Sequence, residues 1–298
     1  MTTAPAASAP LAFLKGHGTE NDFVIVPDPD NALELPASAV AGLCDRRAGI
    51  GGDGLLHVVR SAAHPDAQAM ADRAEWFMDY RNADGSVAEM CGNGVRVFAR
   101  YLQHAGLTDG GDLDIATRGG VKRVHLDKDG GITVAMGRAL LPGGEVTVSV
   151  DERSWPAVHV NMGNPHAVAF VEDLAHAGNL FAPPPFSPAT AYPDGVNVEF
   201  VVDRGPQHVA MRVHERGAAE TRSCGTGACA VAVAAARRDG RDPAVTGTPV
   251  TYTVDVLGGR LLITELTDGT IEMTGPAVIV AEGRIDAAWL ESLTSADA

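Results

Sequence analysis

Two short motifs place a cysteine immediately before a Gly-x-Gly sequence. The first, CGNG, begins at Cys91, and the second, CGTG, begins at Cys224. The stretches at residues 94–106 and 227–238 have a spacing typical of helices that begin at glycines. A thiol at a helix N-terminus lies at the positive end of the helix dipole, which lowers its pKa below the usual value of about 8.5. The glycines leave backbone N–H groups open to a carboxylate or phosphate. Each motif therefore predicts a reactive sulfur beside an anion-binding turn.

Both motifs belong to an internal repeat. Asn82 lies nine residues before Cys91, and Glu215 lies nine residues before Cys224. Two further pairs of segments match in the same order, namely HGTENDFVIV (17–26) with MGNPHAVAFV (162–171), and GIGGDGLL (49–56) with DGVNVEFV (194–201). Three ordered matches indicate duplication of a β-rich α/β unit, with its boundary near residues 127–131.

Two matched thiols suit a reaction that moves a proton between the two faces of one carbon. In a pseudo-symmetric protein, a planar carbanion held between the thiols can be protonated from either side. One sulfur would act as a thiolate base and the other as a thiol acid. The two helix N-termini would stabilise the charge that develops on an adjacent carboxylate. The repeat therefore indicates racemisation or epimerisation at a carbon next to a carboxylate.

Other roles for the cysteines fit the pattern less well. A single CGxG turn is more often structural, but this reading does not explain two such turns at equivalent places of a repeat. Zinc sites need four clustered ligands, whereas Cys224 and Cys229 are five residues apart with no histidine pair. We interpret Cys229 as a packing residue inside its helix, and Cys44 as structural.

The sequence lacks the motifs of the common cofactors. It contains no GxxxxGK[ST] phosphate-binding loop, and no GxGxxG that follows a strand and opens a helix. Its three lysines, Lys15, Lys122 and Lys128, offer no obvious site for pyridoxal phosphate. We therefore expect a protein that uses neither a cofactor nor a metal.

Composition indicates a folded, acidic protein of about two domains. The 298 residues are 45% hydrophobic and 20% charged, and the net charge is −15. An acidic chain argues against nucleic acid and anionic membranes as partners. The longest apolar run, residues 228–236, is shorter than the roughly 20 residues of a membrane helix. The N-terminus does not read as a secretory signal, so we predict a cytosolic protein with reduced thiols.

Much of the chain reads as short strands separated by turns. The second predicted helix is apolar on all sides, so we expect it to be fully buried and wrapped by strands. Residues 1–10 read as a disordered leader, and the Pro-rich stretch 182–190 reads as a surface loop. The predicted strands are residues 23–26, 55–59, 120–126, 132–136, 146–150, 168–171, 196–202, 250–256 and 260–266.

Several long segments resemble diaminopimelate epimerases, from about Leu14 to Gly275. They are HGTENDFV, NADGSVAEMCGNGVRVFARY, NMGNPHAV, GVNVEF and HERGAAETRSCGTGACA. The resemblance implies cofactor-independent interconversion of LL- and meso-2,6-diaminopimelate, in lysine and peptidoglycan precursor synthesis. It also implies an α/β fold of the α+β type and a homodimer. Two pseudo-symmetric domains would each wrap a curved mixed sheet around a central helix, with the active site in the cleft between them.

The resemblance also implies boundaries and residue roles. The N-terminal half would span residues 11–130, with 275–298 returning to it, and the C-terminal half residues 131–274. Cys224 would accept the proton of the LL isomer, and Cys91 would donate one to the opposite face. His166 and Glu215 match residues that tune the thiol pKa values. The residues that match the substrate-binding set are Asn21, Asn82, Gly92, Asn93, Asn164, Asn197, Glu215, Arg216, Gly225 and Thr226.

This set is chemically suited to diaminopimelate. Backbone at Gly92, Asn93, Gly225 and Thr226 would hold the reacting carboxylate. The guanidinium of Arg216, the carboxylate of Glu215 and the amides of the asparagine side chains suit a second zwitterionic amino-acid head.

Three positions depart from the family pattern. Ala219 stands where the family often has Gly, and Gly54 stands where many members have Gln. Ala281 replaces an aromatic residue that some members place at their dimer interface.

Three alternative functions remain open at this point. A proline-type racemase of the same fold would not need the polar set for a distal amino-acid head. A thiol hydrolase or redox enzyme needs one activated cysteine, so a duplicated pair would have no purpose. A carboxylate-binding module needs no thiols at all.

Overall fold

The computed structural model describes residues 10–294 and divides into two compact units. Within this range, unit 1 comprises residues 10–18, 22–130 and 277–294, and unit 2 comprises residues 19–21 and 131–276. The leader expected at residues 1–10 lies outside the described residues except for Pro10. No helix in the described range is both long and apolar enough to cross a membrane.

Unit 1 is built on a mixed sheet. The last strand of the chain, β18, pairs antiparallel with the first, β1, and aligns Ile285 with Leu11. The pairs β2–β3 and β4–β5 are parallel, whereas β3–β4 and β5–β6 are antiparallel. The strands are β1 (Leu11–Gly18), β2 (Asn21–Pro27), β3 (Gly54–Arg60), β4 (Trp76–Asn82), β5 (Gly111–Thr117), β6 (Gly120–Leu126) and β18 (Val278–Ile285).

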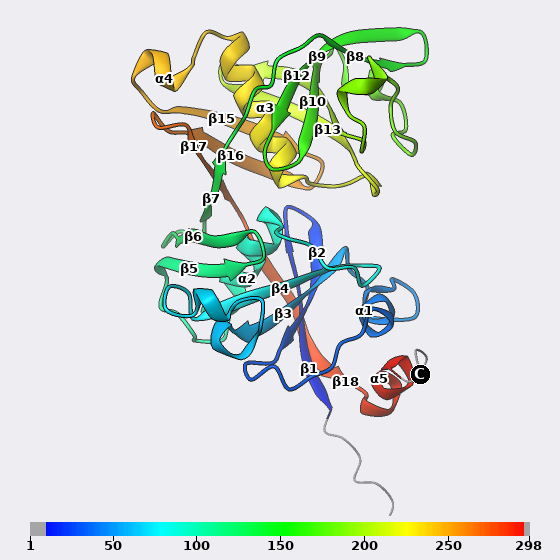
Figure 1. The fold of residues 1–298 in the computed structure, drawn as a ribbon, viewed down its shortest axis with the longest axis vertical. Coiled ribbons are helices and arrows are strands. Elements are labelled where there is room, and N and C mark those ends of the chain that lie inside the picture. Colours follow the sequence, from blue (N-terminus) through cyan, green and yellow to red (C-terminus); the bar gives the residue numbers. More distant parts are fainter. Residues whose placement is uncertain (1–9, 295–298) are drawn as a thin grey trace, which may run out of the picture. The chain divides into compact units, whose positions relative to one another are not determined.

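The central helix of unit 1 is α2 (Gly92–His104), which packs against β1, β3, β4, β6 and β18 (Figure 1). Val95, Phe98 and Leu102 are fully buried on it. Two further helices, α1 (Ala37–Cys44) and α5 (Ala287–Thr294), pack against each other beside the sheet.

Unit 2 repeats the same alternation of pairings. The pairs β10–β12 and β13–β15 are parallel, whereas β9–β10, β12–β13 and β15–β16 are antiparallel. The order of parallel and antiparallel neighbours is therefore that of β2 to β6 in unit 1, as expected for a duplicated unit. The strands are β7 (Ile132–Arg138), β8 (Val146–Val150), β9 (Arg153–Asn161), β10 (Pro165–Phe170), β11 (Phe186–Ser187), β12 (Asn197–Gly205), β13 (His208–Glu215), β14 (Ala219–Glu220), β15 (Val250–Val256), β16 (Gly259–Glu265) and β17 (Thr270–Gly275).

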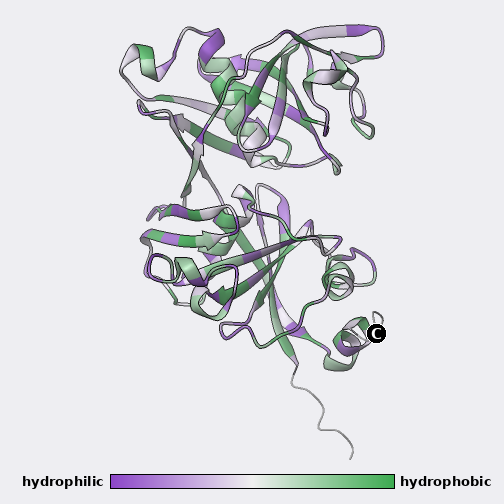
Figure 2. Cartoon of the chain, in the orientation of Figure 1, coloured by the Kyte–Doolittle hydropathy of each residue, from purple (hydrophilic) through white to green (hydrophobic). Residues whose placement is uncertain are grey.

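The central helix of unit 2 is α3 (Gly225–Arg238), and strands surround it. All residues from 227 to 236 on it are buried, and Figure 2 shows the helix as mainly apolar. Small Ala and Val side chains on every side allow the strands to approach closely. The helix ends where Arg237 and Arg238 form ion pairs with Glu265 and Asp203. A short helix, α4 (Pro243–Thr246), follows.

The predicted fold class is confirmed. In each unit a mixed sheet wraps a central helix, and α3 is buried as its composition predicted. Every predicted strand lies in, or overlaps, an observed one. The loop expected at 182–190 contains the two-residue strand β11, which pairs with β8, and a 3₁₀ turn over Ala189–Ala191. Other 3₁₀ turns are Ser61–Ala63, Gln68–Met70 and Leu174–Ala177.

Candidate active site

In unit 1, Cys91 is the N-cap residue of α2. Its backbone is extended, and its sulfur accepts a hydrogen bond from the N–H of Gly94 at 3.4 Å. Gly92 and Asn93 form the first turn, as the motif predicted. Asn93 is buried, and its Oδ1 accepts a hydrogen bond from Arg96 Nη2 at 2.8 Å. The first turn is therefore held in place by its own side chains.

In unit 2, Cys224 is the N-cap residue of α3 in the same geometry. Its sulfur accepts a hydrogen bond from the N–H of Gly227 at 3.3 Å and lies 3.5 Å from Thr226 Oγ1. Gly225 begins the helix. Neither cysteine forms a disulfide bond, and Cys224 is buried whereas Cys91 is partly exposed. The same capping geometry thus occurs once in each unit.

The expected lowering of the thiol pKa is wrong for Cys224. Burial raises the pKa of this thiol well above its usual value, and the negative charges of Glu215 and Glu199 raise it further. The hydrogen bonds from Thr226 and Gly227 act in the opposite direction but do not compensate. Desolvation and nearby carboxylates outweigh the helix N-terminus here. The motif did not reveal these effects, because they depend on tertiary packing.

Glu215 lies at the end of β13, close to the sulfur of Cys224. Its carboxylate accepts hydrogen bonds from Thr221 Oγ1 and from the Cys224 thiol. Burial raises the pKa of Glu215, although the Thr221 and Cys224 hydrogen bonds counteract this effect. A buried carboxyl group in contact with a thiol can exchange a proton with it.

His166 and Asn164 lie beside the first turn of α3. Asn164 Nδ2 donates to Thr226 Oγ1 at 3.4 Å, and Asn164 Oδ1 lies 3.0 Å from His166 Nε2. The other ring nitrogen, His166 Nδ1, lies 2.6 Å from Glu199 Oε1. His166 and Glu199 are both fully buried. These polar groups therefore form one connected set that reaches the capping turn.

Asn197 joins three segments at the start of β12. Its Nδ2 donates to the carbonyl of Pro165 at 3.0 Å, and its Oδ1 accepts from the backbone N–H of Arg216 at 3.0 Å. The Arg216 side chain extends along the turn and donates to the carbonyl of Asp194 at 3.3 Å. Asn197 thus fixes the backbone that carries the guanidinium.

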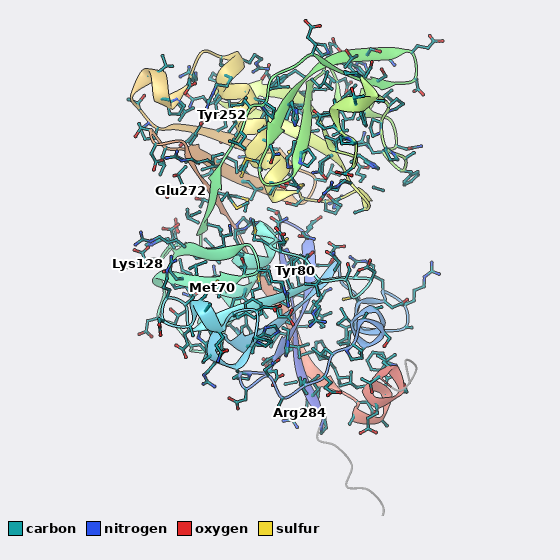
Figure 3. The ribbon with its side chains drawn as sticks, viewed as in Figure 1. Met70, Tyr80, Lys128, Tyr252, Glu272 and Arg284 are labelled. Atoms are coloured by element: carbon teal, nitrogen blue, oxygen red, sulfur yellow. The ribbon has the colours of Figure 1, made fainter. Side chains whose placement is uncertain are left out.

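Asn82 and Asn21 complete the predicted set. Asn82, at the end of β4 in unit 1, accepts from the hydroxyl of Tyr80 (Figure 3) at 3.0 Å and donates to Ser86 Oγ at 3.0 Å. Asn21 begins β2 and belongs to the short segment 19–21 that joins unit 2. Thr19 Oγ1, hydrogen-bonded to Ser223 Oγ at 2.6 Å, holds that segment next to the residue before Cys224.

The structure assigns the predicted residues to the two units. Unit 1 carries Asn82, Cys91, Gly92 and Asn93, and the others belong to unit 2. In unit 2 the structure connects Asn164, His166, Thr226 and Cys224 by side-chain contacts, as it does Glu215 and Cys224, and it ties Asn197 to Arg216.

Sequence reasoning missed two features of this site. Glu199 is a charged residue in the middle of the apolar strand VNVEFVV. Such a residue could have been recognised from the sequence as a candidate buried functional group. The Thr19–Ser223 hydrogen bond carries no sequence signal, because it joins residues 204 positions apart. Among residues 10–294, no group of three or more His, Cys, Asp or Glu side chains is arranged to hold a metal ion.

The structure shows the local environment of the positions at which the sequence departs from the family pattern. Ala219 adopts a left-handed backbone with φ of +65°, a conformation that favours glycine. A Cβ on Gly54 would lie 2.6 Å from the carbonyl oxygen of Arg81 and 2.8 Å from Tyr80 Cε2, so a larger residue does not fit here. Ala281 is exposed on β18.

Comparison with known proteins decides the family. The diaminopimelate epimerase family model matches residues 13–142 and 158–280. The chain belongs to the diaminopimelate epimerase family. A curated diaminopimelate epimerase from Streptomyces coelicolor is 79% identical over 286 residues, which cover 96% of this chain and 99% of that protein. One from Thermobifida fusca is 50% identical, covering 92% and 98%.

Solved structures of low identity share the fold of this diaminopimelate epimerase family member. A PhzF-family phenazine biosynthesis protein from Bacillus anthracis matches with a TM-score of 0.71 at 17% identity, covering 93% of this chain and 99% of that one. A hydroxyproline epimerase from Agrobacterium vitis matches with a TM-score of 0.65 at 12% identity, covering 93% and 92%. At such identities the likeness concerns the fold alone.

Proposed function

We propose that this protein interconverts LL- and meso-2,6-diaminopimelate without a cofactor. The observation that carries the proposal is the pair of cysteine-capped helices, one in each unit of a chain that belongs to this family. Each helix offers a sulfur next to backbone N–H groups that can bind one carboxylate. The enzyme is therefore an isomerase with a thiol acid and a thiol base, and each unit is one half of it.

In the proposed reaction, Cys224 as thiolate takes the α-proton of the LL isomer. The carbon–hydrogen bond breaks, and its electron pair moves into the α-carboxylate, which the N–H groups of the capping turns stabilise. Cys91 as thiol then protonates the opposite face of the same carbon. A thiolate whose pKa is raised is a stronger base than an ordinary one, and the burial of Cys224 supports this role. Reversal of both steps returns the LL isomer.

The remaining residues of the proposed site hold the substrate. Arg216, with its backbone anchored on Asn197, pairs with the distal carboxylate. Asn21, Asn82 and Asn164 supply amides for the distal amino-acid head. Glu215 receives a hydrogen bond from the Cys224 thiol and so influences its protonation.

We further propose a cytoplasmic role in lysine and peptidoglycan precursor synthesis, with the protein acting as a homodimer. The net charge of −15 supports a small-molecule substrate rather than nucleic acid or an anionic membrane.

The proposal is tested with optically pure LL-diaminopimelate and no added cofactor, followed by chiral separation of the product. We expect meso-diaminopimelate from the wild type and none from Cys91→Ala or Cys224→Ala. L-Proline in the same assay tests the proline-type alternative. Racemisation of proline without turnover of diaminopimelate would refute the proposal.

A further inference from the structure

Arg216 directly follows β13, and unit 2 holds both its main chain and its side chain. Its backbone N–H donates to Asn197 Oδ1 at 3.0 Å, and its Nη1 donates to the carbonyl oxygen of Asp194 at 3.3 Å. Among residues 10–294, no carboxylate forms an ion pair with its guanidinium. A guanidinium has five N–H donors. The charge and most of the donors of this exposed side chain are therefore available to an anionic ligand.

The Asp194 carbonyl belongs to a β-turn, Tyr192–Gly195, which we call the support turn. The N–H of Gly195 donates to the carbonyl oxygen of Tyr192 at 3.1 Å and closes the turn. Pro193, at the second position, has a fixed φ, and glycine is typical of the fourth position. Tyr192 is only 4% exposed and belongs to a hydrophobic cluster of unit 2. The support turn is thus anchored in the core by its first residue.

Gly195 lies against the aliphatic part of the Arg216 side chain. A Cβ at this position would lie 3.2 Å from Arg216 Cδ and 3.4 Å from Arg216 Cγ. Both distances are shorter than the roughly 3.5–4.0 Å at which carbon atoms normally pack. The φ of Gly195 is +81°, a conformation that favours glycine. Any other residue would therefore push the arginine side chain away from the support turn.

The repeat separates Arg216 from the framework that the two units share. When the two capping cysteines are aligned, Arg216 corresponds to Ala83 of unit 1. Holding an arginine side chain in one conformation costs rotamer entropy, and an exposed hydrogen bond to a neutral carbonyl returns little stability. The contact between Arg216 and the support turn therefore calls for a reason other than stability. Binding of a ligand with an anionic group is the reason that the chemistry of a guanidinium offers.

We propose that Gly195 is a positioning residue that orients the Arg216 guanidinium for the distal carboxylate of diaminopimelate. The support turn holds the aliphatic part through Gly195 and one nitrogen through the Asp194 carbonyl, so the guanidinium is ordered before the substrate binds. Parallel N–H···O bonds to a carboxylate require a defined orientation, and prior ordering reduces the entropy lost on binding. The inference rests on the proposed function for the identity of the ligand, but the placement of Arg216 is independent of it.

Gly195→Ala should displace the guanidinium without removing it. The new Cβ pushes the Arg216 side chain outward and weakens its hydrogen bond to the Asp194 carbonyl. The distal carboxylate keeps its charge throughout the reaction, so its contact is as strong in the ground state as in the transition state. Loss of such uniform binding raises KM and leaves kcat unchanged.

Gly269 provides a matched control in the same unit. It also follows an aspartate, occupies the fourth position of a β-turn and donates its N–H to the carbonyl oxygen of Leu266, at 2.9 Å. Its φ is +83°, and a Cβ at this position would meet nothing within 4 Å. Gly269→Ala therefore introduces the same backbone strain as Gly195→Ala, without a contact to Arg216.

Three measurements compare the wild type with Gly195→Ala and Gly269→Ala. Phenylglyoxal labelling of the substrate-free protein, read by mass spectrometry, reports the reactivity of Arg216, and Arg212, which is paired with Glu220, is the internal reference. Calorimetric titration gives dissociation constants for diaminopimelate and for L-lysine, which has hydrogen in place of the distal carboxylate. Steady-state kinetics with diaminopimelate give kcat and KM.

In Gly195→Ala, phenylglyoxal should label Arg216 severalfold faster, because the guanidinium loses its bond to the Asp194 carbonyl. Labelling of Arg212, and all labelling in Gly269→Ala, should match the wild type. The dissociation constant and the KM of diaminopimelate should rise by roughly threefold to thirtyfold, which is below the roughly 10²-fold cost of a misplacement by 1 Å. The kcat and the dissociation constant of lysine should change little.

Equal Arg216 labelling in Gly195→Ala and Gly269→Ala would overturn the role of Gly195. An equal loss of affinity for lysine and diaminopimelate would do the same, since it would indicate general damage to the site. Absence of diaminopimelate binding by the wild type would instead refute the proposed function together with the ligand named here. Gly195→Asn keeps the test decisive if Gly195→Ala does not fold, because asparagine carries the same Cβ but adopts positive φ more readily.

Discussion

At the residue scale, two sets of forces act on the sulfur of Cys224 in opposite directions. Burial and the charges of Glu215 and Glu199 favour the thiol, whereas hydrogen bonds from Thr226 and Gly227 favour the thiolate. The first set is stronger, so the pKa is raised and the group is protonated at neutral pH. The fraction of thiolate therefore increases as pH rises toward that pKa.

The charge of Glu215 can be tested separately from that of Glu199. Glu215→Gln removes the second-largest cause of the raised pKa of Cys224, so the thiolate should form at lower pH. Iodoacetamide labelling of Cys224 between about pH 7 and 10 should shift downward, with Cys91 in the same molecule as control. A labelling profile identical to that of the wild type would show that Glu215 does not influence this thiol.

At the element scale, strand β14 begins with a strained residue. Ala219 has φ of +65°, and it pairs with Glu215 across the turn. A non-glycine residue in this conformation costs about 1 kcal/mol, which glycine avoids. The strain lies directly beside two residues of the proposed site, Glu215 and Arg216.

Ala219→Gly should therefore stabilise the protein by less than about 1 kcal/mol, since the entropic cost of a more flexible chain offsets part of the relieved strain. Ala218→Gly is the matched control, because Ala218 does not have positive φ and its replacement gives no relief. Urea unfolding monitored by hydrogen exchange of β13 provides the measurement. Equal effects of the two substitutions would show that the turn is not strained.

A buried charge network holds β3 and β4 together in unit 1. Asp79 is 1% exposed and contacts His57, Arg81 and Arg118. Burial alone would raise its pKa, but hydrogen bonds from His57 and Arg81 and the charge of Arg118 hold it well below the usual value. Because the folded pKa is the lower one, this stabilisation is present above the unfolded value of about 3.9 and is lost as pH falls.

Asp79→Asn should lower the stability of unit 1 by about 3–5 kcal/mol at pH 7, since it leaves buried cations without their partner. The difference from the wild type should shrink as pH falls below about 4. Asp66→Asn is the control, because Asp66 is half-exposed and its ion pair with Arg118 should contribute less than about 1 kcal/mol. Hydrogen exchange of β3 and β4 amides at both pH values measures the effect. A loss that is independent of pH would contradict the account.

The sequence predicted the features that depend on neighbouring residues and missed those that depend on residues far apart in the chain. The burial of α3 follows from a run of apolar residues, and the two N-caps follow from short motifs, so both were predictable. The pairing of Leu11 with Ile285 joins the two ends of the chain and leaves no local pattern. The pKa of Cys224 was predicted in the wrong direction, because burial and nearby carboxylates raise it, and both depend on tertiary packing.

At the scale of the whole molecule, the two units share one pairing order and one capping geometry but differ beneath the caps. Unit 1 places Phe23 and Leu56 there, and unit 2 places His166 and Glu199. Duplication therefore explains why there are two thiols, and the residues beneath the two caps give them different surroundings. A reaction with one base and one acid requires that one thiol is ionised while the other is protonated.

The incorporation of solvent hydrogen tests this two-thiol account most directly. In D₂O, the reaction of LL-diaminopimelate is stopped when only a small fraction of the substrate has been converted. Both isomers are then separated and analysed by mass spectrometry. If Cys224 removes the proton and Cys91 supplies another that has exchanged with solvent, the early meso product carries deuterium at the inverted carbon. The recovered LL substrate stays mostly protiated. Early meso product that retains the substrate's own α-hydrogen, or a Cys91→Ala protein that epimerises at the wild-type rate, would contradict the account.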